Sequence, residues 1–230
     1  MQIEPIAHIE SDFRTKFGVP RQSGLAPALR SRVVFVPRFR NDEALRGLET
    51  FSHIWLIWGF SETERAEWSP TVRPPRLGGN KRVGVFASRS PFRPNSLALS
   101  SVRLVAVEPL PDKGMTLVVA GADLMDGTPI YDIKPYIAYT DSHPEARCGF
   151  TDDVPKPVVE VVIPEKLKGL LPSDKMEALR QVLAFNPAPA YHDEPDRVYG
   201  FTFSGVEVKF FIANGVLTVT EIIENQDNIQ

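Results

Sequence analysis

Two arginines, Arg89 and Arg93, lie four residues apart in the segment SRSPFRPN, residues 88–95. Pro91 and Pro94 fix their own φ angles and bias the preceding residues toward extended backbone, so a stiff loop is predicted here. A stiff backbone lowers the entropy cost of using a guanidinium, whose planar fork matches a carboxylate or a phosphate. The pattern therefore predicts an anion-binding loop. The alternative is a proline-rich corner with two surface arginines.

A second group of polar residues follows in LMDGTPIYDIKPY, residues 124–136. The turn at residues 126–129 can direct both an aspartate side chain and glycine-exposed backbone amides toward a ligand. Asp132, Lys134 and Tyr136 then alternate, which places all three on one face of a strand. The alternative is the solvated face of an edge strand.

A third motif, VPRQSG at residues 19–24, contains Gln22, whose side-chain amide can both donate to and accept from an adenine edge. Alone, this motif is a weak signal. His53 is expected to be a core histidine rather than a catalyst. The tryptophans are expected to be packing residues rather than stacking platforms: Trp55, Trp58 and Trp68.

The charges of the chain are segregated. Its net charge is −3, from 26 basic and 29 acidic residues, which is not the basic excess of a non-specific nucleic-acid binder. Yet a first basic window (residues 13–40) holds seven basic residues and no acid. A second basic window (residues 65–95) holds seven basic residues and one acid. If the fold joins the two windows, they form a positive surface that attracts a polyanion. The alternative is that these arginines pair with distant acids.

Several classes of protein are disfavoured. The 230 residues are 43% hydrophobic, enough for a proper core, and no apolar run or signal peptide is visible, so a cytoplasmic protein without a membrane span is expected. The single Cys148 excludes an internal disulfide, and four scattered histidines argue against a metal site. The sequence lacks G-x-S-x-G, a phosphate loop, H-E-x-x-H and G-x-G-x-x-G, which disfavours a serine hydrolase, an NTPase, a zinc protease and a dinucleotide enzyme.

The elements that must position these motifs are mainly strands. Segments rich in β-branched and aromatic residues, separated by turn signals, predict strands at residues 32–36, 53–60, 82–88, 97–107 and 115–124. Asn41 can cap a short helix over residues 42–48. Many strands with few helices favour an antiparallel sheet that is closed or partly closed into a barrel.

The C-terminal part has a different pattern. Ser173 can cap a helix that ends before Asn186. The hairpin signals Ser204-Gly205 and Asn214-Gly215 then predict three strands, at residues 199–203, 207–212 and 216–222.

Between residues 140 and 156 the composition shifts to Asp, Ser, Pro, Glu and Thr, which is typical of a linker. We therefore predict a mainly β protein with an N-terminal antiparallel β-barrel-like domain (residues 1–147) and a smaller C-terminal α+β domain (residues 148–230).

The sequence resembles the TsaA-like family of tRNA-methyltransferase O in four motifs that occur in this order: VPRQSGL, LETFSHIWLIWGF, VRPPRLGGNKRVGVFASRSPFRPNSLALS and DLMDGTPIYDIKPY. The match covers residues 1 to about 145, and RVYGFTFSGVEVKFFI is similar to the family's smaller domain. The resemblance implies a β-barrel methyltransferase, unlike the usual Rossmann type. It implies a homodimer that uses S-adenosylmethionine to methylate the exocyclic amine of threonylcarbamoyl-adenosine beside the tRNA anticodon. The family's Asp-Pro-Arg-Pro-Ala-Tyr motif departs here to NPAPAY, residues 186–191.

On this resemblance, cofactor contacts are expected from Gln22, Ser23, Gly24, Phe86, Arg93, Leu124, Asp126, Gly127, Thr128, Pro129 and Ile130. Contacts to the tRNA anticodon arm are expected from Arg73, Arg76, Lys81, Arg82, Arg89 and Lys134. Methyl transfer is an in-line displacement, so alignment should supply most of the acceleration. The amide-like nitrogen must still lose a proton, and the candidate acceptors are Asp126, Asp132 and Tyr136.

Two other functions are compatible with the same residues. A non-catalytic RNA-binding module that uses the two basic windows predicts a strongly salt-dependent RNA affinity, unaffected by cofactor. An enzyme acting on a small anionic adenine compound predicts that tRNA does not compete for binding.

Overall fold

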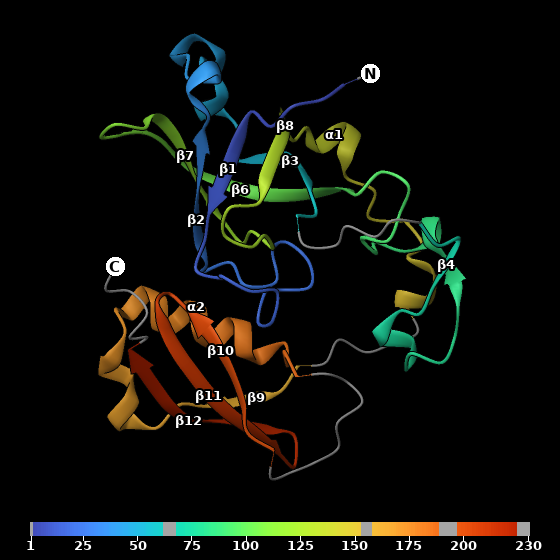
Figure 1. Ribbon diagram of the computed structural model, residues 1–230, viewed down its shortest axis with the longest axis vertical. Coiled ribbons are helices and arrows are strands. Elements are labelled where there is room, and N and C mark those ends of the chain that lie inside the picture. Colours follow the sequence, from blue (N-terminus) through green and yellow to red (C-terminus); the bar gives the residue numbers. More distant parts are fainter. Residues whose placement is uncertain (1, 62–67, 153–157, 189–196, 225–230) are drawn as a thin grey trace.

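The computed structural model describes residues 2–61, 68–152, 158–188 and 197–224. Two sheets lie one above the other along its longest axis, and a small arm projects from one side (Figure 1). The upper sheet is formed by β1 (Ala7–Glu10), β2 (Arg30–Phe35), β3 (His53–Gly59), β6 (Leu97–Leu110), β7 (Gly114–Ala120) and β8 (Pro129–Pro135).

The upper sheet is antiparallel and barrel-like, with strand order β1-β2-β7-β6-β3-β8. β1 also pairs with β8, at Ala7↔Ile130 and His8↔Pro129, so a short seam joins the two ends of the order. Inward-facing residues alternate with outward-facing ones. In β2, for example, every second residue is buried, namely Ser31, Val33 and Phe35, and the residues between them are half-buried. The fully buried Ile54, Leu56 and Leu117 belong to the core that these inward faces form.

The lower sheet belongs to a smaller α+β unit. It contains β9 (Glu160–Val162), β10 (Tyr199–Phe203), β11 (Val206–Ala213) and β12 (Val216–Glu224), in the order β10-β11-β12-β9. Helix α2 (Ser173–Ala184) buries Leu179 and Leu183 in the same core as the sheet. Both predicted hairpin turns are present, and Asn214 and Gly215 have the positive φ angles, 52° and 77°, that a two-residue turn of this kind requires.

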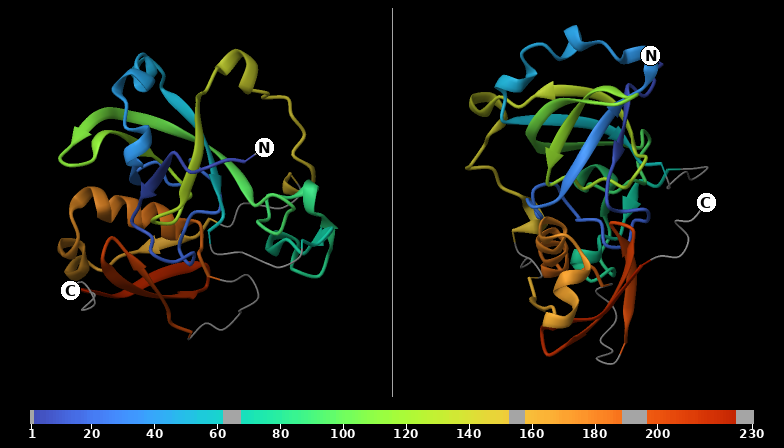
Figure 2. Two further views of the ribbon diagram at one scale, coloured as in Figure 1. Left: turned by 45° about the horizontal axis from the view of Figure 1, so that its top comes forward. Right: turned by 90° about the vertical axis from the view of Figure 1, so that its left-hand side faces the viewer.

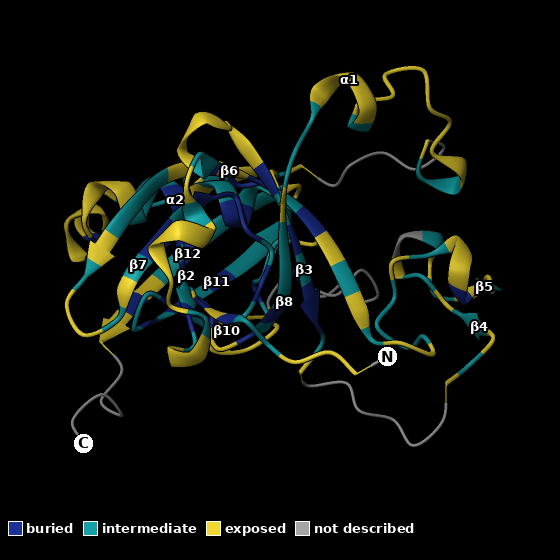
Figure 3. Cartoon of the chain, turned by 90° about the horizontal axis from the view of Figure 1, so that it is seen from above, coloured by how far each residue is buried: buried dark blue, intermediate teal, exposed yellow. Residues whose placement is uncertain are grey.

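The arm consists of β4 (Thr71–Val72) and β5 (Val83–Gly84), and it stands apart from both sheets (Figure 3). A short helix, α1 (Ala138–Asp141), follows β8. The described residues also contain 3₁₀ helices at Pro37–Phe39, Asp42–Leu45, Leu48–Thr50, Pro75–Leu77, Val85–Ala87, Gly149–Thr151 and Glu165–Leu170.

A joint segment, residues 11–29, links the two sheets (Figure 2). It follows β1 in sequence, yet its apolar side chains, among them Phe13 and Leu29, are buried in the core of the lower unit. Asp12 forms an ion pair with Lys175 of α2 at 2.6 Å. The Ala28 backbone N–H donates to the Gln181 side chain at 2.8 Å. The lower unit therefore fixes the position of a segment that belongs to the N-terminal half of the chain.

The mainly β class, with a larger barrel-like sheet and a smaller α+β unit, is confirmed. The boundary between residues 147 and 148 stays a prediction. The strand predicted at residues 82–88 is wrong beyond Val83–Gly84. The chain turns there into a 3₁₀ helix, because the Ser88 side chain and backbone N–H both bond back to the Val85 carbonyl.

Two further expectations need correction. The helix predicted at residues 42–48 is a 3₁₀ helix over Asp42–Leu45, although Asn41 caps it as expected by accepting from the Glu43 N–H. Ser173 is the first residue of α2 rather than its cap, and the preceding Pro172 occupies the cap position. The short strands β1 and β9 were not predicted.

Candidate active site

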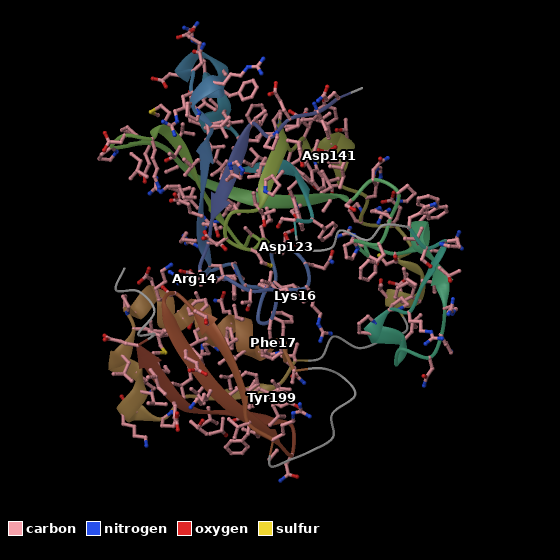
Figure 4. The ribbon with its side chains drawn as sticks, in the orientation of Figure 1. Arg14, Lys16, Phe17, Asp123, Asp141 and Tyr199 are labelled. Atoms are coloured by element: carbon pink, nitrogen blue, oxygen red, sulfur yellow. The ribbon has the colours of Figure 1, made fainter. Side chains whose placement is uncertain are left out.

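A cavity of about 730 Å³ lies where the barrel meets the joint segment. Segments far apart in sequence line it: parts of residues 16–22, 55–61, 88–93, 97–100 and 123–128. Figure 4 places Asp123 at the end of the barrel nearest the lower unit, above the part of the joint segment that carries Lys16 and Phe17. The volume falls in the range of about 300–1,000 Å³ that small-molecule sites span.

Aromatic and aliphatic side chains form much of the cavity wall. Trp55, Ile57 and Trp58 come from β3, and Phe60 follows it. The rings of Trp58 and Phe60 meet edge to face, with centroids 4.6 Å apart. Trp55 and Trp58 were expected to be packing residues, and the structure shows that both also reach the cavity.

The two basic windows meet at this cavity. The first contributes Lys16 and Arg21 to its lining, and the second contributes Arg89 and Arg93. Arg89 also donates to the Gln22 side-chain oxygen, which ties the windows together. The joining of the windows that the charge pattern suggested is therefore present, but it involves only part of each.

Other arginines of the first window have structural partners. Arg32 forms an ion pair with Glu108 at 2.8 Å, and Arg38 forms one with Glu4 at 2.8 Å. Arg40 donates to backbone carbonyls, including that of Phe35 at 2.9 Å. For Arg32 and Arg38, pairing with a distant acid is therefore the correct interpretation, whereas backbone carbonyls hold Arg40.

The Arg93 loop has the internal bonding expected of a stiff segment. The Ser88 hydroxyl accepts from the Ser90 N–H, and the Ser90 hydroxyl accepts from the Phe92 N–H, both at 3.3 Å. Arg93 donates one guanidinium N–H group to the carbonyls of Ser88 and Ser90, at 3.1 and 3.3 Å. Short-range bonds thus hold the Arg93 side chain at the cavity wall.

A chain of hydrogen bonds connects three polar groups at the cavity. The Trp58 indole Nε1–H donates to the Ser100 hydroxyl at 2.9 Å, and that hydroxyl donates to Asp123 Oδ1 at 2.6 Å. Burial raises the pKa of Asp123, while the bonds from Ser100 and from backbone N–H groups and the charge of Arg89 oppose that rise. A half-buried carboxylate with a raised pKa in a cavity is a functional-site signal.

The structure places some of the expected cofactor residues in the cavity lining and others outside it. Gln22, Arg93 and Thr128 line the cavity. Ser23 contributes a backbone N–H bond to Asp123, and the Gly24 N–H donates to the Gly121 carbonyl at 2.8 Å.

The other expected cofactor residues are not among those that line the cavity. Leu124 and Ile130 are buried in the barrel core, and Phe86 is 73% exposed on the arm, stacked on Trp68. Asp126 accepts from the Ser11 N–H at 2.9 Å. Two backbone contacts hold the rest of this turn to β1: Gly127 N–H to the Ile9 carbonyl, and the pairing of Pro129 with His8.

The three candidate proton acceptors lie near the cavity but do not line it. Asp132 forms an ion pair with Lys134 at 2.9 Å, as expected for neighbours on one strand face. The Tyr136 ring lies 5.5 Å from the ring of Trp55, which lines the cavity. Asp126 lies between the cavity-lining residues Met125 and Thr128 in sequence.

The residues expected to contact tRNA are dispersed. Arg73, Lys81 and Arg82 are exposed on or beside the arm, where Arg82 donates to the Thr71 hydroxyl at 3.0 Å. Arg76 lies in the 3₁₀ helix of the arm, Arg89 is at the cavity, and Lys134 pairs with Asp132 as described. Arg65 and residues 189–191 of the NPAPAY motif lie outside the described residues.

Sequence reasoning missed Lys16, Arg21, Ser100 and Asp123 as cavity residues. One signal was available for Asp123, because an acid directly after the apolar run MTLVVAGA is unusual at the end of a buried strand. Within the described ranges, no cluster of His, Cys, Asp and Glu side chains is arranged to hold a metal ion. No described helix is long and apolar enough to cross a membrane.

Trp55 is oriented by α1, the short helix after β8. Its indole N–H donates to Asp141 Oδ2 at 2.9 Å, and the same oxygen accepts from the Ile137 N–H at 2.9 Å. The Ile137 and Trp55 bonds, in that order, are the main causes that lower the pKa of Asp141.

We expect Asp141→Asn to be less stable than the wild type at neutral pH, with a difference that disappears in acid. A group whose pKa is lower in the folded state stabilises the protein at pH values above its unfolded-state pKa. This contribution is lost as the pH falls through the folded-state pKa. Urea unfolding of both proteins across the acid range measures the difference. A difference that stays constant with pH would contradict the assignment.

Family models match both parts of the chain: the tRNA-methyltransferase O N-terminal domain over residues 8–142 and the TrmO C-terminal domain over residues 161–225. The chain is 38% identical over 221 residues to the tRNA (adenine(37)-N6)-methyltransferase of Escherichia coli, covering 93% of this chain and 94% of that one. It is 41% identical to a putative S-adenosylmethionine-dependent methyltransferase of Pseudomonas aeruginosa, over 90% of each. A crystal structure of TrmO from P. aeruginosa superposes with a TM-score of 0.79 and 34% identity, covering 98% of this chain and 97% of that one. The chain therefore belongs to the tRNA-methyltransferase O family.

Proposed function

We propose that this protein transfers a methyl group from S-adenosylmethionine to the exocyclic amine of threonylcarbamoyl-adenosine beside a tRNA anticodon. The observation that carries the proposal is the composition of the cavity, which combines aromatic walls, four basic side chains and one half-buried carboxylate in a member of this family. The E. coli and P. aeruginosa relatives, named as a tRNA methyltransferase and an S-adenosylmethionine-dependent methyltransferase, support the enzyme class and the cofactor.

The cavity residues fit S-adenosylmethionine. The Gln22 amide can donate to and accept from the adenine edge. Trp58 and Phe60 provide the aromatic surface that a sulfonium cation favours, without any metal. Arg93 offers a guanidinium to the carboxylate of the methionine end. When bound, S-adenosylmethionine supplies the electrophilic methyl group.

The protein's main contribution to rate is then alignment of the acceptor nitrogen with the methyl group. The nitrogen must also lose its proton. Among the three candidate acceptors, Tyr136 has a ring that contacts Trp55, a residue of the cavity wall. We propose that the proton of the nitrogen leaves on the side of the site where Tyr136 lies.

The substrate carries negative charge on both its phosphates and its threonyl carboxylate. Lys16, Arg21 and Arg89 at the cavity, and Lys81 and Arg82 on the arm, are the basic groups proposed to attract it. A non-catalytic RNA-binding module would not need a cavity with an acid in its wall, so the geometry favours the enzyme over that alternative.

We further propose that the enzyme is a cytoplasmic homodimer. Leu97 and Leu99 of β6 line the cavity and are 37% and 53% exposed. They lie on the neighbouring strand to Trp55 and Ile57, where Leu99 pairs with Ile57 in register. An apolar strip of this kind at a site is typical of an interface, and sedimentation velocity tests it.

Arg93→Ala is expected to reduce methyl transfer to tRNA about tenfold or more, because a charge-assisted bond to the cofactor carboxylate is lost. The assay follows labelled methyl groups from S-adenosylmethionine onto tRNA with and without threonylcarbamoyl-adenosine. Arg46→Ala removes an exposed arginine whose ion-pair partner is Glu43, outside the cavity lining, and should leave transfer unchanged. If the wild type methylates both tRNAs equally, or methylates neither, the proposed substrate is wrong.

A further inference from the structure

Asp123 is the one carboxylate among the described residues that line the cavity, where it shares the space with Lys16, Arg21, Arg89 and Arg93. A site built only to attract a polyanion would gain nothing from a negative charge in its wall, because that charge repels the ligand. Four cations and one anion instead match a ligand that carries charges of both signs. The amino-acid end of S-adenosylmethionine, with its carboxylate and its ammonium group, is such a ligand.

The hydrogen-bond chain fixes Asp123 as an acceptor. An indole N–H can only donate, so the Ser100 hydroxyl must accept from Trp58. The single hydroxyl proton of Ser100 is then directed at Asp123 Oδ1, 2.6 Å away. Oδ1 therefore carries no proton in this arrangement and is an acceptor of hydrogen bonds.

Asp123 is half-buried, and the loss of water around its carboxylate raises its pKa. Loss of water is the largest influence on the pKa of Asp123. It outweighs the hydrogen bond from Ser100 and the charge of Arg89, whose side chain is exposed. A buried charge is stabilised when a charge of opposite sign reaches it inside the site. The cavity side of Asp123 is where a ligand can provide that charge.

We propose that Asp123 binds the ammonium group of the methionine end of the cofactor, while basic side chains of the same cavity bind its carboxylate. This inference rests on the proposed function. The ammonium group, rather than the sulfonium, is the partner because it has N–H groups to donate to a carboxylate oxygen, whereas the sulfonium has none. Asp123 is thus a binding residue that holds the methionine end in place.

The test compares three ligands by calorimetry on the wild type and on Asp123→Asn, which keeps the size and loses the charge. S-adenosylmethionine and S-adenosylhomocysteine both carry the ammonium group, but only the first carries the sulfonium. 5′-Methylthioadenosine lacks the whole amino-acid end. We expect the variant to bind the first two about tenfold or more weakly, by similar factors, and to bind the third like the wild type. Asp42→Asn, an exposed acid outside the cavity lining, is the control.

Each other result identifies a different role. Weakening of S-adenosylmethionine alone would place Asp123 at the sulfonium, and weakening of all three ligands would place it at the adenosine end. Unchanged binding with slower methyl transfer would make Asp123 part of proton transfer. All three overturn the inference while the proposed function stands. If the wild type binds neither S-adenosylmethionine nor S-adenosylhomocysteine, the proposed function fails and the inference fails with it.

A second measurement does not depend on the folding of the variant. An S-adenosylhomocysteine analogue in which hydrogen replaces the amino group should bind the wild type about tenfold or more weakly than S-adenosylhomocysteine itself. On a folded Asp123→Asn protein, the same pair of ligands should bind nearly alike. Equal affinity of the pair for the wild type would overturn the inference.

Discussion

Gly18→Ala is expected to lower the free energy of unfolding by about 2–5 kcal/mol and to weaken cofactor binding. Gly18 is buried in the joint segment and has a φ angle of +94°, a left-handed conformation that costs a residue with a Cβ about 1–2 kcal/mol. An added Cβ would also lie 2.7 Å from Phe201 Cε2 and closer still to Cδ2. Phe201 is itself buried in the lower core, so it cannot move aside without further cost.

The effect on binding follows from position in the chain. Val19, Pro20, Arg21 and Gln22 come directly after Gly18 and form one wall of the cavity. A displacement at Gly18 therefore moves this wall relative to the barrel, even though Gly18 itself is not among the lining residues.

Gly47→Ala provides a matched control. Gly47 has a φ angle of +88°, but a Cβ there would meet no atom within 4 Å. It should lose only the conformational term, about 1–2 kcal/mol, and bind the cofactor normally. Urea unfolding and calorimetry measure both effects. Equal losses in the two variants would show that the contact with Phe201 contributes nothing.

Much of the fold follows from local patterns. The turns at Ser204-Gly205 and Asn214-Gly215 and the apolar face of α2 were visible in the sequence because each depends on residues close together in the chain. The stiff Arg93 loop was also predictable, since its prolines and serines set its geometry over a few residues. Short strands such as β1 are recognisable only through their partners in the sheet.

The site was harder to predict because it depends on long-range contacts. Asp123 accepts its side-chain hydrogen bond only because Ser100 of β6 lies beside it, and nothing near it in sequence indicates this neighbour. The role of the joint segment was hidden for the same reason. Its apolar residues resemble those of any loop that covers a barrel, yet they complete the core of a unit that begins far along the chain.

Phe13→Ala is expected to cost about 3–5 kcal/mol of stability, the range for removing a buried phenylalanine. Phe13 is 1% exposed, and its ring meets that of Phe203 edge to face, with centroids 5.5 Å apart. Its backbone carbonyl accepts from the Asp126 N–H at 2.8 Å. One residue thus connects the lower core to the turn that leads into β8, and the variant should lose methyl transfer as well as stability.

Phe51→Ala separates this effect from the general loss of an aromatic ring. Phe51 is 37% exposed and belongs to neither core cluster, so its removal should cost less than that of Phe13, about 1–2 kcal/mol. If the lower unit holds the joint segment, and with it one wall of the cavity, Phe13→Ala must weaken cofactor binding even under conditions where it remains folded. Normal binding by a folded Phe13→Ala protein would mean that the barrel alone shapes the cavity, and the lower unit would then need another role.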